Sequence, residues 1–171
     1  MGVWLWYRWL NLQEFNSLLF VKDKHNLCGF NVWSCGDYNH NLTGFTINNL
    51  PNTTVTLSKN YVVNGEYGIK ITRNATEGYY TQLKTICTIS EEDYCKTFTF
   101  SAYVNNQLDN SCNLQLSSGT FKVLAIPKDA EGLFNISLEI PSDINDITCA
   151  LTFSGDRVGT VYTDNWSITI Q

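Results

Sequence analysis

The chain has 171 residues and a formal net charge of −5, with 11 lysines and arginines against 16 acidic residues. Binding to a nucleic-acid backbone or to anionic lipid needs clustered cations, so this charge balance disfavours both kinds of partner. No run of about 18 apolar residues is present, so membrane insertion through a helix is not expected. The length suits one domain with a substantial hydrophobic core.

Residues 1–15 form a separate segment that is rich in aromatic side chains. The segment has no basic start, no long apolar middle and no small-residue cleavage site, so it is a poor match to a signal peptide. Its rings either cover one end of the following domain or dock on another chain. The residues expected to dock on another chain are Trp4, Trp6, Tyr7 and Trp9.

From residue 16 onward, apolar and polar residues alternate in short runs. The clearest run includes Phe98, Phe100, Ala102 and Val104, which alternate with Thr97, Thr99, Ser101 and Tyr103. Side chains on a strand point alternately to opposite faces, so this pattern predicts a strand with one buried face. Runs of this kind predict strands at 16–21, 42–47, 53–58, 67–72, 79–88, 96–105, 112–117, 120–126, 133–140, 147–153 and 160–170.

The connections between these runs are typical of turns and loops. Asn64-Gly65 and Ser117-Ser118-Gly119 are typical turn sequences, and residues 90–93 suit one helical turn. Many short, half-buried strands separated by turns predict an all-β protein, either an antiparallel β-sandwich or a barrel. Trp166 has the same parity as the apolar residues that follow it, so we expect it in the core.

Six cysteines are present, and none has the spacing of a zinc or thioredoxin-like motif. Two pairs, Cys28/Cys35 and Cys87/Cys95, are close enough in sequence to bridge short loops and are the expected disulfides if the protein matures outside the cell. The alternative is a set of free thiols. Cys149 lies at an inward strand position and reads as a small buried hydrophobe.

No catalytic arrangement is visible in the sequence. Only two histidines occur, His25 and His40, and no nucleophile elbow, phosphate loop or dinucleotide motif is present. A glycosidase needs two carboxylates facing one cleft, and no pattern indicates such a pair. The sequence therefore predicts a protein that is not an enzyme.

Four local patterns, in order, are similar to those of a known family. Residues 65–72 resemble a "G-x-Y-S-L-K-I-T" strand, and Tyr79-Tyr80-Thr81-Gln82 resembles the aromatic-aromatic-x-Gln strand that follows it. Residues 96–104 resemble a "K-T-Y-T-F-S-A-Y-V" strand, and residues 161–168 resemble the closing strand. Over residues 16–171 the chain thus resembles carbohydrate-binding modules of the family 4 and 9 type.

This resemblance implies an antiparallel β-sandwich of the jelly-roll kind and a non-catalytic role in binding a glycan or a cell-surface polymer. Sugar rings stack on aromatic side chains, while amides bond the hydroxyls. Tyr103 faces outward on its strand, and the family order places the strand of Tyr80 and Gln82 next to it. The candidate ligand-binding residues are Trp33, Tyr38, Tyr80, Gln82 and Tyr103.

The same family occurs in enzymes that act on glycans, in phage tail and fibre proteins and in microbial adhesins. It often has a structural calcium ion, but the usual Asn-Gly-Asp-Phe entry is replaced here by residues 16–23, so no cofactor is expected. A virion protein would combine an extracellular composition with a poor export signal, and its partners would be other virion or surface-protein subunits. The alternatives are a purely structural assembly protein and a binding module cut from a glycoside hydrolase.

Overall fold

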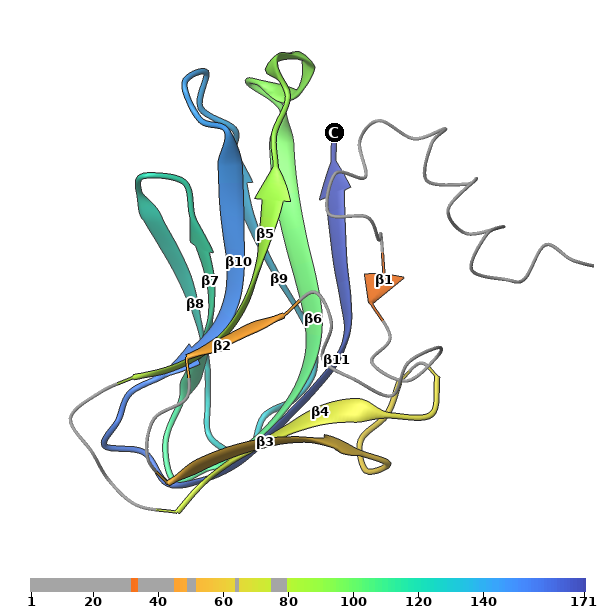
Figure 1. Ribbon diagram of the computed structural model, residues 1–171, viewed down its shortest axis with the longest axis vertical. Coiled ribbons are helices and arrows are strands. Elements are labelled where there is room, and N and C mark those ends of the chain that lie inside the picture. Colours follow the sequence, from red (N-terminus) through yellow and green to blue (C-terminus); the bar gives the residue numbers. More distant parts are fainter. Residues whose placement is uncertain (1–31, 34–44, 49–51, 64, 75–79) are drawn as a thin grey trace, which may run out of the picture.

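The computed structural model describes residues 32–33, 45–48, 52–63, 65–74 and 80–171. Within these ranges the chain forms two antiparallel sheets that pack face to face, with one 3₁₀ turn at Glu91–Asp93 (Figure 1). No helix in this part of the chain has the length and apolar character needed to cross a membrane. The predicted antiparallel β-sandwich is confirmed, while segment 1–15 and the predicted strand at 16–21 lie outside the described residues.

The first sheet, which we call sheet A, has the strand order β3-β4-β11-β6-β9, with β1 paired to part of β11. Each neighbouring pair is antiparallel. Its strands are β1 (Val32–Trp33), β3 (Thr53–Ser58), β4 (Gly68–Arg73), β6 (Thr97–Leu108), β9 (Glu131–Glu139) and β11 (Gly159–Ile170).

The second sheet, sheet B, has the order β2-β5-β10-β7-β8 and is also antiparallel throughout. Its strands are β2 (Thr46–Asn48), β5 (Thr81–Thr88), β7 (Cys112–Ser117), β8 (Phe121–Ile126) and β10 (Asp146–Phe153). From β4 onward the chain passes repeatedly between the sheets, so strands that follow one another in sequence are often not neighbours in space.

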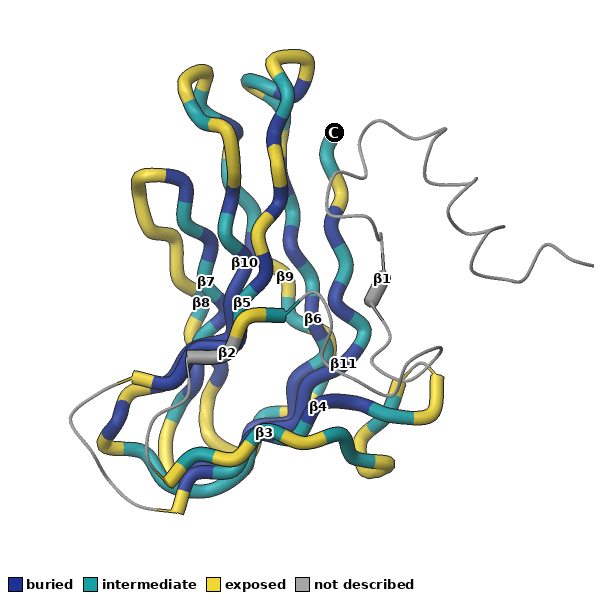
Figure 2. Tube along the Cα trace, in the orientation of Figure 1, coloured by how far each residue is buried: buried dark blue, intermediate teal, exposed yellow. Residues whose placement is uncertain are grey.

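The core lies between the two sheets and is built mainly from alternating residues of the strands. Phe98, Phe100 and Ala102 of β6 face Leu114 and Leu116 of β7 across the sandwich, and all five are fully buried. Figure 2 shows the resulting alternation of buried and more exposed residues along the strands. The alternation seen in the sequence thus identifies the inner faces correctly, because burying apolar surface is the main driving force for folding.

A β-bulge in β11 reverses its alternation partway along the strand. The pairing of β11 with β6 shifts register between Asp164 and Ser167, and Asn165 between them has a φ of 52°. One extra residue in a strand switches the face to which all later side chains point. Val161 and Trp166 therefore both point into the core, although they are five positions apart.

Trp166 lies in the core, as predicted, and is 1% exposed. Its ring centroid lies 4.9 Å from that of Phe45 and 4.9 Å from that of Phe100. The indole Nε1 donates a hydrogen bond of 2.7 Å to Thr163 Oγ1, which satisfies its only polar group. The ring is thus fully used in packing and is not a platform for a ligand.

The predicted disulfide between Cys87 and Cys95 is wrong. Cys87 is disulfide-bonded, but Cys95 is an exposed free thiol. The side chain of Cys87 points into the sandwich, where it is 1% exposed, so it does not meet a thiol on the surface of the loop. The other predicted pair, Cys28/Cys35, lies outside the described residues. Cys149 is a buried free thiol, in agreement with its reading as a hydrophobe.

A second correction concerns strand order. The strand of Tyr80 and Gln82 was expected to lie beside that of Tyr103, but β5 pairs with β2 and β10 in sheet B, whereas β6 pairs with β11 and β9 in sheet A. Alternation in a sequence shows which residues share a face of one strand, but it does not show to which sheet the strand belongs. The two aromatic residues therefore lie on opposite outer faces of the sandwich.

Candidate functional site

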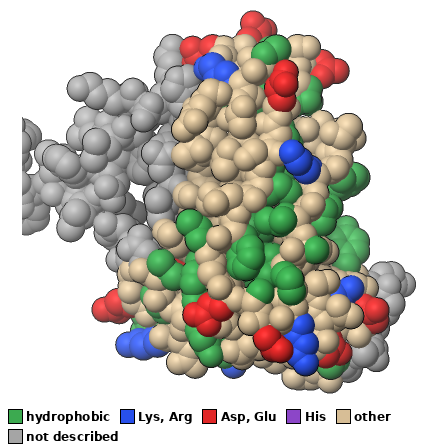
Figure 3. Space-filling view, turned by 180° about the vertical axis from the view of Figure 1, so that it is seen from behind, with side chains coloured by type: hydrophobic (Ala, Val, Ile, Leu, Met, Phe, Trp, Pro, Cys, Tyr) green, Lys and Arg blue, Asp and Glu red, His purple; other side chains and the backbone are tan. Residues whose placement is uncertain are grey.

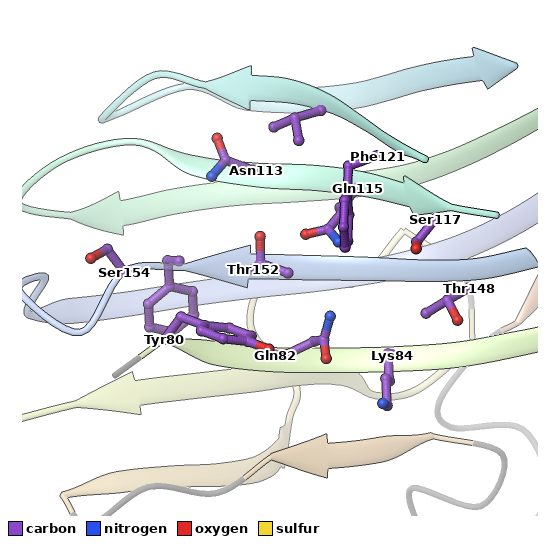
Figure 4. A pocket seen from close by; sticks show the side chains of 12 residues that line it. Tyr80, Gln82, Lys84, Asn113, Gln115, Ser117, Phe121, Thr148, Thr152 and Ser154 are labelled. Carbon is purple, nitrogen blue, oxygen red and sulfur yellow. The ribbon is translucent and has the colours of Figure 1, made fainter. Parts of the chain in front are cut away.

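The outer face of sheet B carries a cavity of about 710 Å³, which we call the groove (Figure 4). It extends over β5, β10, β7 and β8, and most of its side chains occupy outward positions of these strands. The residues that line it are Tyr80, Gln82, Lys84, Asn113, Gln115, Ser117, Phe121, Val123, Thr148, Thr152, Phe153 and Ser154.

The strand register arranges the groove in rows that cross the sheet. Directly opposed residues on neighbouring antiparallel strands lie side by side on the same face. The three rows, from β8 to β5, are Ala125–Asn113–Thr152–Gln82, Val123–Gln115–Ala150–Lys84 and Phe121–Ser117–Thr148–Ile86. The first and second rows supply the amides, and the third supplies hydroxyls between two apolar side chains.

Two amide side chains in the groove have no hydrogen-bond partner among the described residues. They belong to Asn113 and Gln115, which are neighbouring outward positions of β7. An amide carries both a donor and an acceptor, so it can bond groups that themselves donate and accept, as hydroxyls do. Gln82 adds a third amide from β5, and in Figure 4 these three side chains lie on both sides of Thr152.

Exposed apolar side chains flank this polar surface. Tyr80, immediately before β5, is 57% exposed, and Phe121, on the edge strand β8, is 73% exposed. Val123, on the same strand, is 55% exposed. Large apolar side chains held in solvent around polar groups are typical of ligand sites, because they give a ligand apolar surface to cover.

The described lining of the groove carries a positive charge. Of the described residues that line it, only Lys84 is charged, and none is an aspartate, glutamate or histidine. These residues therefore offer hydrogen bonds, apolar contact and one positive charge, but they provide no pair of carboxylates for general acid–base chemistry. Among the described residues there is also no cluster of side chains that could hold a metal ion.

The outer face of sheet A is arranged differently, because its polar groups bond one another. Tyr103 donates a hydrogen bond of 2.5 Å to Glu131 Oε1, and Asn105 donates one of 2.5 Å to Glu131 Oε2. Partial burial, and then this bond to Glu131, raise the pKa of Tyr103 to about 12. Gln107 donates a hydrogen bond to the Tyr61 hydroxyl at 2.8 Å. The tyrosines of this face are thus engaged within the protein.

Figure 3 shows the molecule from the side opposite to Figure 1, where sheet A faces the viewer. Backbone and side chains that are neither charged nor hydrophobic make up much of the upper half, and hydrophobic side chains gather in the lower half. Beside sheet A the ring centroids of Tyr61 and Tyr162 lie 4.7 Å apart, and Lys70 Nζ lies 5.9 Å from the Tyr162 centroid. These contacts have the geometry of packing between neighbouring side chains.

The structure brings together two of the five ligand-binding residues expected from the sequence. Tyr80 and Gln82 line the groove, and Tyr103 lies on the other face of the sandwich. Trp33 belongs to β1, where its backbone pairs with Trp166, and Tyr38 lies outside the described residues. The residues expected to contact a partner chain, Trp4, Trp6, Tyr7 and Trp9, also lie outside them.

Sequence reasoning missed the contribution of β7 and β8 to the groove. Residues 112–117 were predicted as a strand, but Asn113 and Gln115 were not among the expected ligand-binding residues, and neither was Phe121. A signal was available, because Phe121 and Val123 are successive residues on one face of the predicted strand and both are apolar. Two exposed apolar residues next to each other on an edge strand are typical of a binding surface.

No family model matches the chain, and no curated protein matches its sequence. Solved structures do match. The enzymatically active domain of tailspike protein 4 from bacteriophage CBA120 superimposes with a TM-score of 0.68 at 12% identity; the match covers 84% of this chain but only 22% of that one.

Carbohydrate-binding modules match over most of their own length. The C-terminal family 22 module of Clostridium thermocellum Xyn10B has a TM-score of 0.53 at 14% identity, with 79% of this chain and 90% of that chain covered. TmCBM61, solved with β-1,4-galactotriose, has a TM-score of 0.52 at 10% identity, with coverage of 80% and 92%. The chain therefore has the β-sandwich fold of carbohydrate-binding modules. These neighbours come from groups other than families 4 and 9, so the likeness is to β-sandwich modules in general.

Proposed function

We propose that this chain is a non-catalytic glycan-binding domain that holds a saccharide in the groove of sheet B. One observation carries the proposal: the groove combines the amides of Asn113 and Gln115, which have no partner among the described residues, with the exposed rings of Tyr80 and Phe121. A sugar presents hydroxyls at its rim and apolar C–H groups on its faces, so it needs both kinds of contact at once.

The structural neighbours support this proposal. The family 22 module bears a cleft whose residues act in ligand binding, and TmCBM61 was solved with a galactose trisaccharide bound. Both have the same β-sandwich fold as this chain, and both match it over about four fifths of its length. A shared fold does not fix the sugar that is bound, so the glycan array described next identifies it.

A glycan array with purified protein tests the proposal, followed by variants on each face of the sandwich. Tyr80→Ala and Asn113→Ala alter the groove, and Asn135→Ala alters an exposed asparagine on β9 of sheet A. Loss of one hydrogen bond of about 1 kcal/mol weakens binding roughly fivefold, so Asn113→Ala should do so while Asn135→Ala has no effect. Absence of binding to every glycan would refute the proposal and favour a purely structural assembly protein.

We further propose that the domain acts in a virion or at a cell surface, where it recognises a surface carbohydrate of the host. The tailspike neighbour supports this, since its matching region is a small part of a much larger phage protein. The aromatic segment 1–15 would then attach the domain to a neighbouring subunit through Trp4, Trp6, Tyr7 and Trp9, because aromatic side chains often dominate such interfaces. Deletion of residues 1–10 should leave a folded domain that no longer joins its assembly, and an unfolded product would contradict this role.

A further inference from the structure

Among the described residues that line the groove, one side chain is charged, and none of the others carries an opposite charge. Lys84 is an outward residue of β5, half-buried, and it forms no ion pair with any described residue. The other lining residues that the structure describes are uncharged. An ammonium group offers three hydrogen-bond donors and no acceptor, so it is satisfied best by an anionic acceptor.

The position of Lys84 places this charge within reach of a bound ligand. It occupies the middle row, where Ala150 of β10 separates it from Gln115 of β7. Ala150 is small and fully buried beneath its neighbours, so no side chain stands between the lysine and the amide. In Figure 4 the Lys84 side chain lies over β5 and extends away from β10, which puts its charge on the β5 side of the groove.

Among the residues of this face that the structure describes, no carboxylate lies close enough to compete for Lys84. On the outward face of β10 the acidic residue is Asp146, which is opposite Thr88 and four residues from Ala150. At about 3.3 Å per residue this separation is about 13 Å. Charges in solvent are largely screened beyond about 8 Å at physiological salt, so Asp146 does not neutralise the lysine.

We propose that the groove selects an acidic glycan, one that carries carboxylate groups, and that Lys84 is the residue that recognises the charge. This inference rests on the proposed function, whose sugar class it specifies. The carboxylate would accept hydrogen bonds from Lys84 on the β5 side, while the amides of Asn113 and Gln115 bond hydroxyls nearer β8. Hydrogen bonds between charged partners are roughly twice as strong as neutral ones, which makes the charge a basis for selection.

Matched polysaccharide pairs test this proposal. Each pair consists of a uronic-acid polymer and the same polymer with its carboxylates methyl-esterified or reduced, and several backbones are included. Affinity is measured by calorimetry or affinity electrophoresis at neutral pH. We expect the wild-type protein to bind the acidic member of at least one pair about tenfold more tightly, and to lose most of this preference at high salt because the charges are then screened.

Two variants and a control identify the source of the preference. Lys84→Gln should bind both members of a pair with the affinity that the wild-type protein has for the neutral one, and Lys84→Arg should retain the preference because it keeps the charge. Lys70→Gln, at an outward position of β4 on sheet A, serves as the control and should leave the preference unchanged.

The outcomes separate this inference from the proposed function. Equal binding of both members of every pair, or a preference that survives in Lys84→Gln, would overturn the role of Lys84 and leave glycan binding intact. A sulfated polymer that binds while the uronic acids do not would overturn the assignment to carboxylates. Failure to bind any polysaccharide, charged or neutral, would overturn both proposals.

Discussion

Truncation of Phe121 gives a sharp test of the groove, because this ring is 73% exposed and contributes little to the core. An aromatic side chain has roughly 200 Å² of surface, so about 150 Å² of it lies in solvent. A sugar that stacks on one face of the ring would cover about half of this, or about 75 Å². At about 25 cal/mol per Å² the contact contributes about 1.9 kcal/mol, which corresponds to roughly a twentyfold change in Kd.

The matched control is Leu133→Ala. Leu133 is 56% exposed and lies on β9, the edge strand of sheet A, just as Phe121 lies on β8, the edge strand of sheet B. Calorimetric titration with the best glycan from the array should show weaker binding for Phe121→Ala and an unchanged Kd for Leu133→Ala. Both proteins should unfold within about 1.3 kcal/mol of the wild type, since only about 50 Å² of the Phe121 ring is buried. Wild-type affinity in Phe121→Ala, or an equal loss in both variants, would show that the ring is not a stacking surface.

Two further predictions concern the stability of the sandwich and its thiols. Gly159→Ala should lower the free energy of unfolding by about 2–3 kcal/mol in a denaturant titration, because its φ is +123° and a Cβ would lie 2.5 Å from the Gln107 carbonyl oxygen. Gly119→Ala should cost only about 1 kcal/mol, since its φ is +84° but no atom lies within 4 Å of the added Cβ; equal losses would contradict the steric argument. Alkylation of the native protein at pH 8 should modify Cys95 but not Cys112, because Cys95 is exposed whereas burial raises the pKa of Cys112 to about 12. Peptide mass spectrometry distinguishes the two sites, and rapid modification of Cys112 would show that this end of β7 opens readily.

Most strands were predictable from the sequence because they carry their own local signal, but β1, at Val32–Trp33, was not among the predicted strands. β3 and β7 begin and end at the residues expected from the alternation and the flanking turn residues. The bulge in β11 was harder to predict from the sequence, because Val161 and Trp166 belong to two alternating runs that are out of phase. Only the pairing with β6 shows that one extra residue joins these runs into a single strand.

The candidate site was predictable only in part, because it depends on which strands share a sheet. Tyr80 and Gln82 were identified by a local pattern, and they do line the groove. Tyr103 has an equally suggestive pattern but lies on sheet A. Lys84 gave no signal, because a lysine at an outward strand position is ordinary until the charges of its neighbours in space are known.

The separation of the groove from the core has a consequence for how this domain can change its ligand. Most groove residues alternate along their strands with the buried residues that hold the two sheets together. Substitutions at outward positions such as Asn113 and Gln115 therefore leave the packing beneath them in place. New sugar preferences can accumulate on this surface, by mutation in nature or by library selection in the laboratory, while the scaffold keeps its stability.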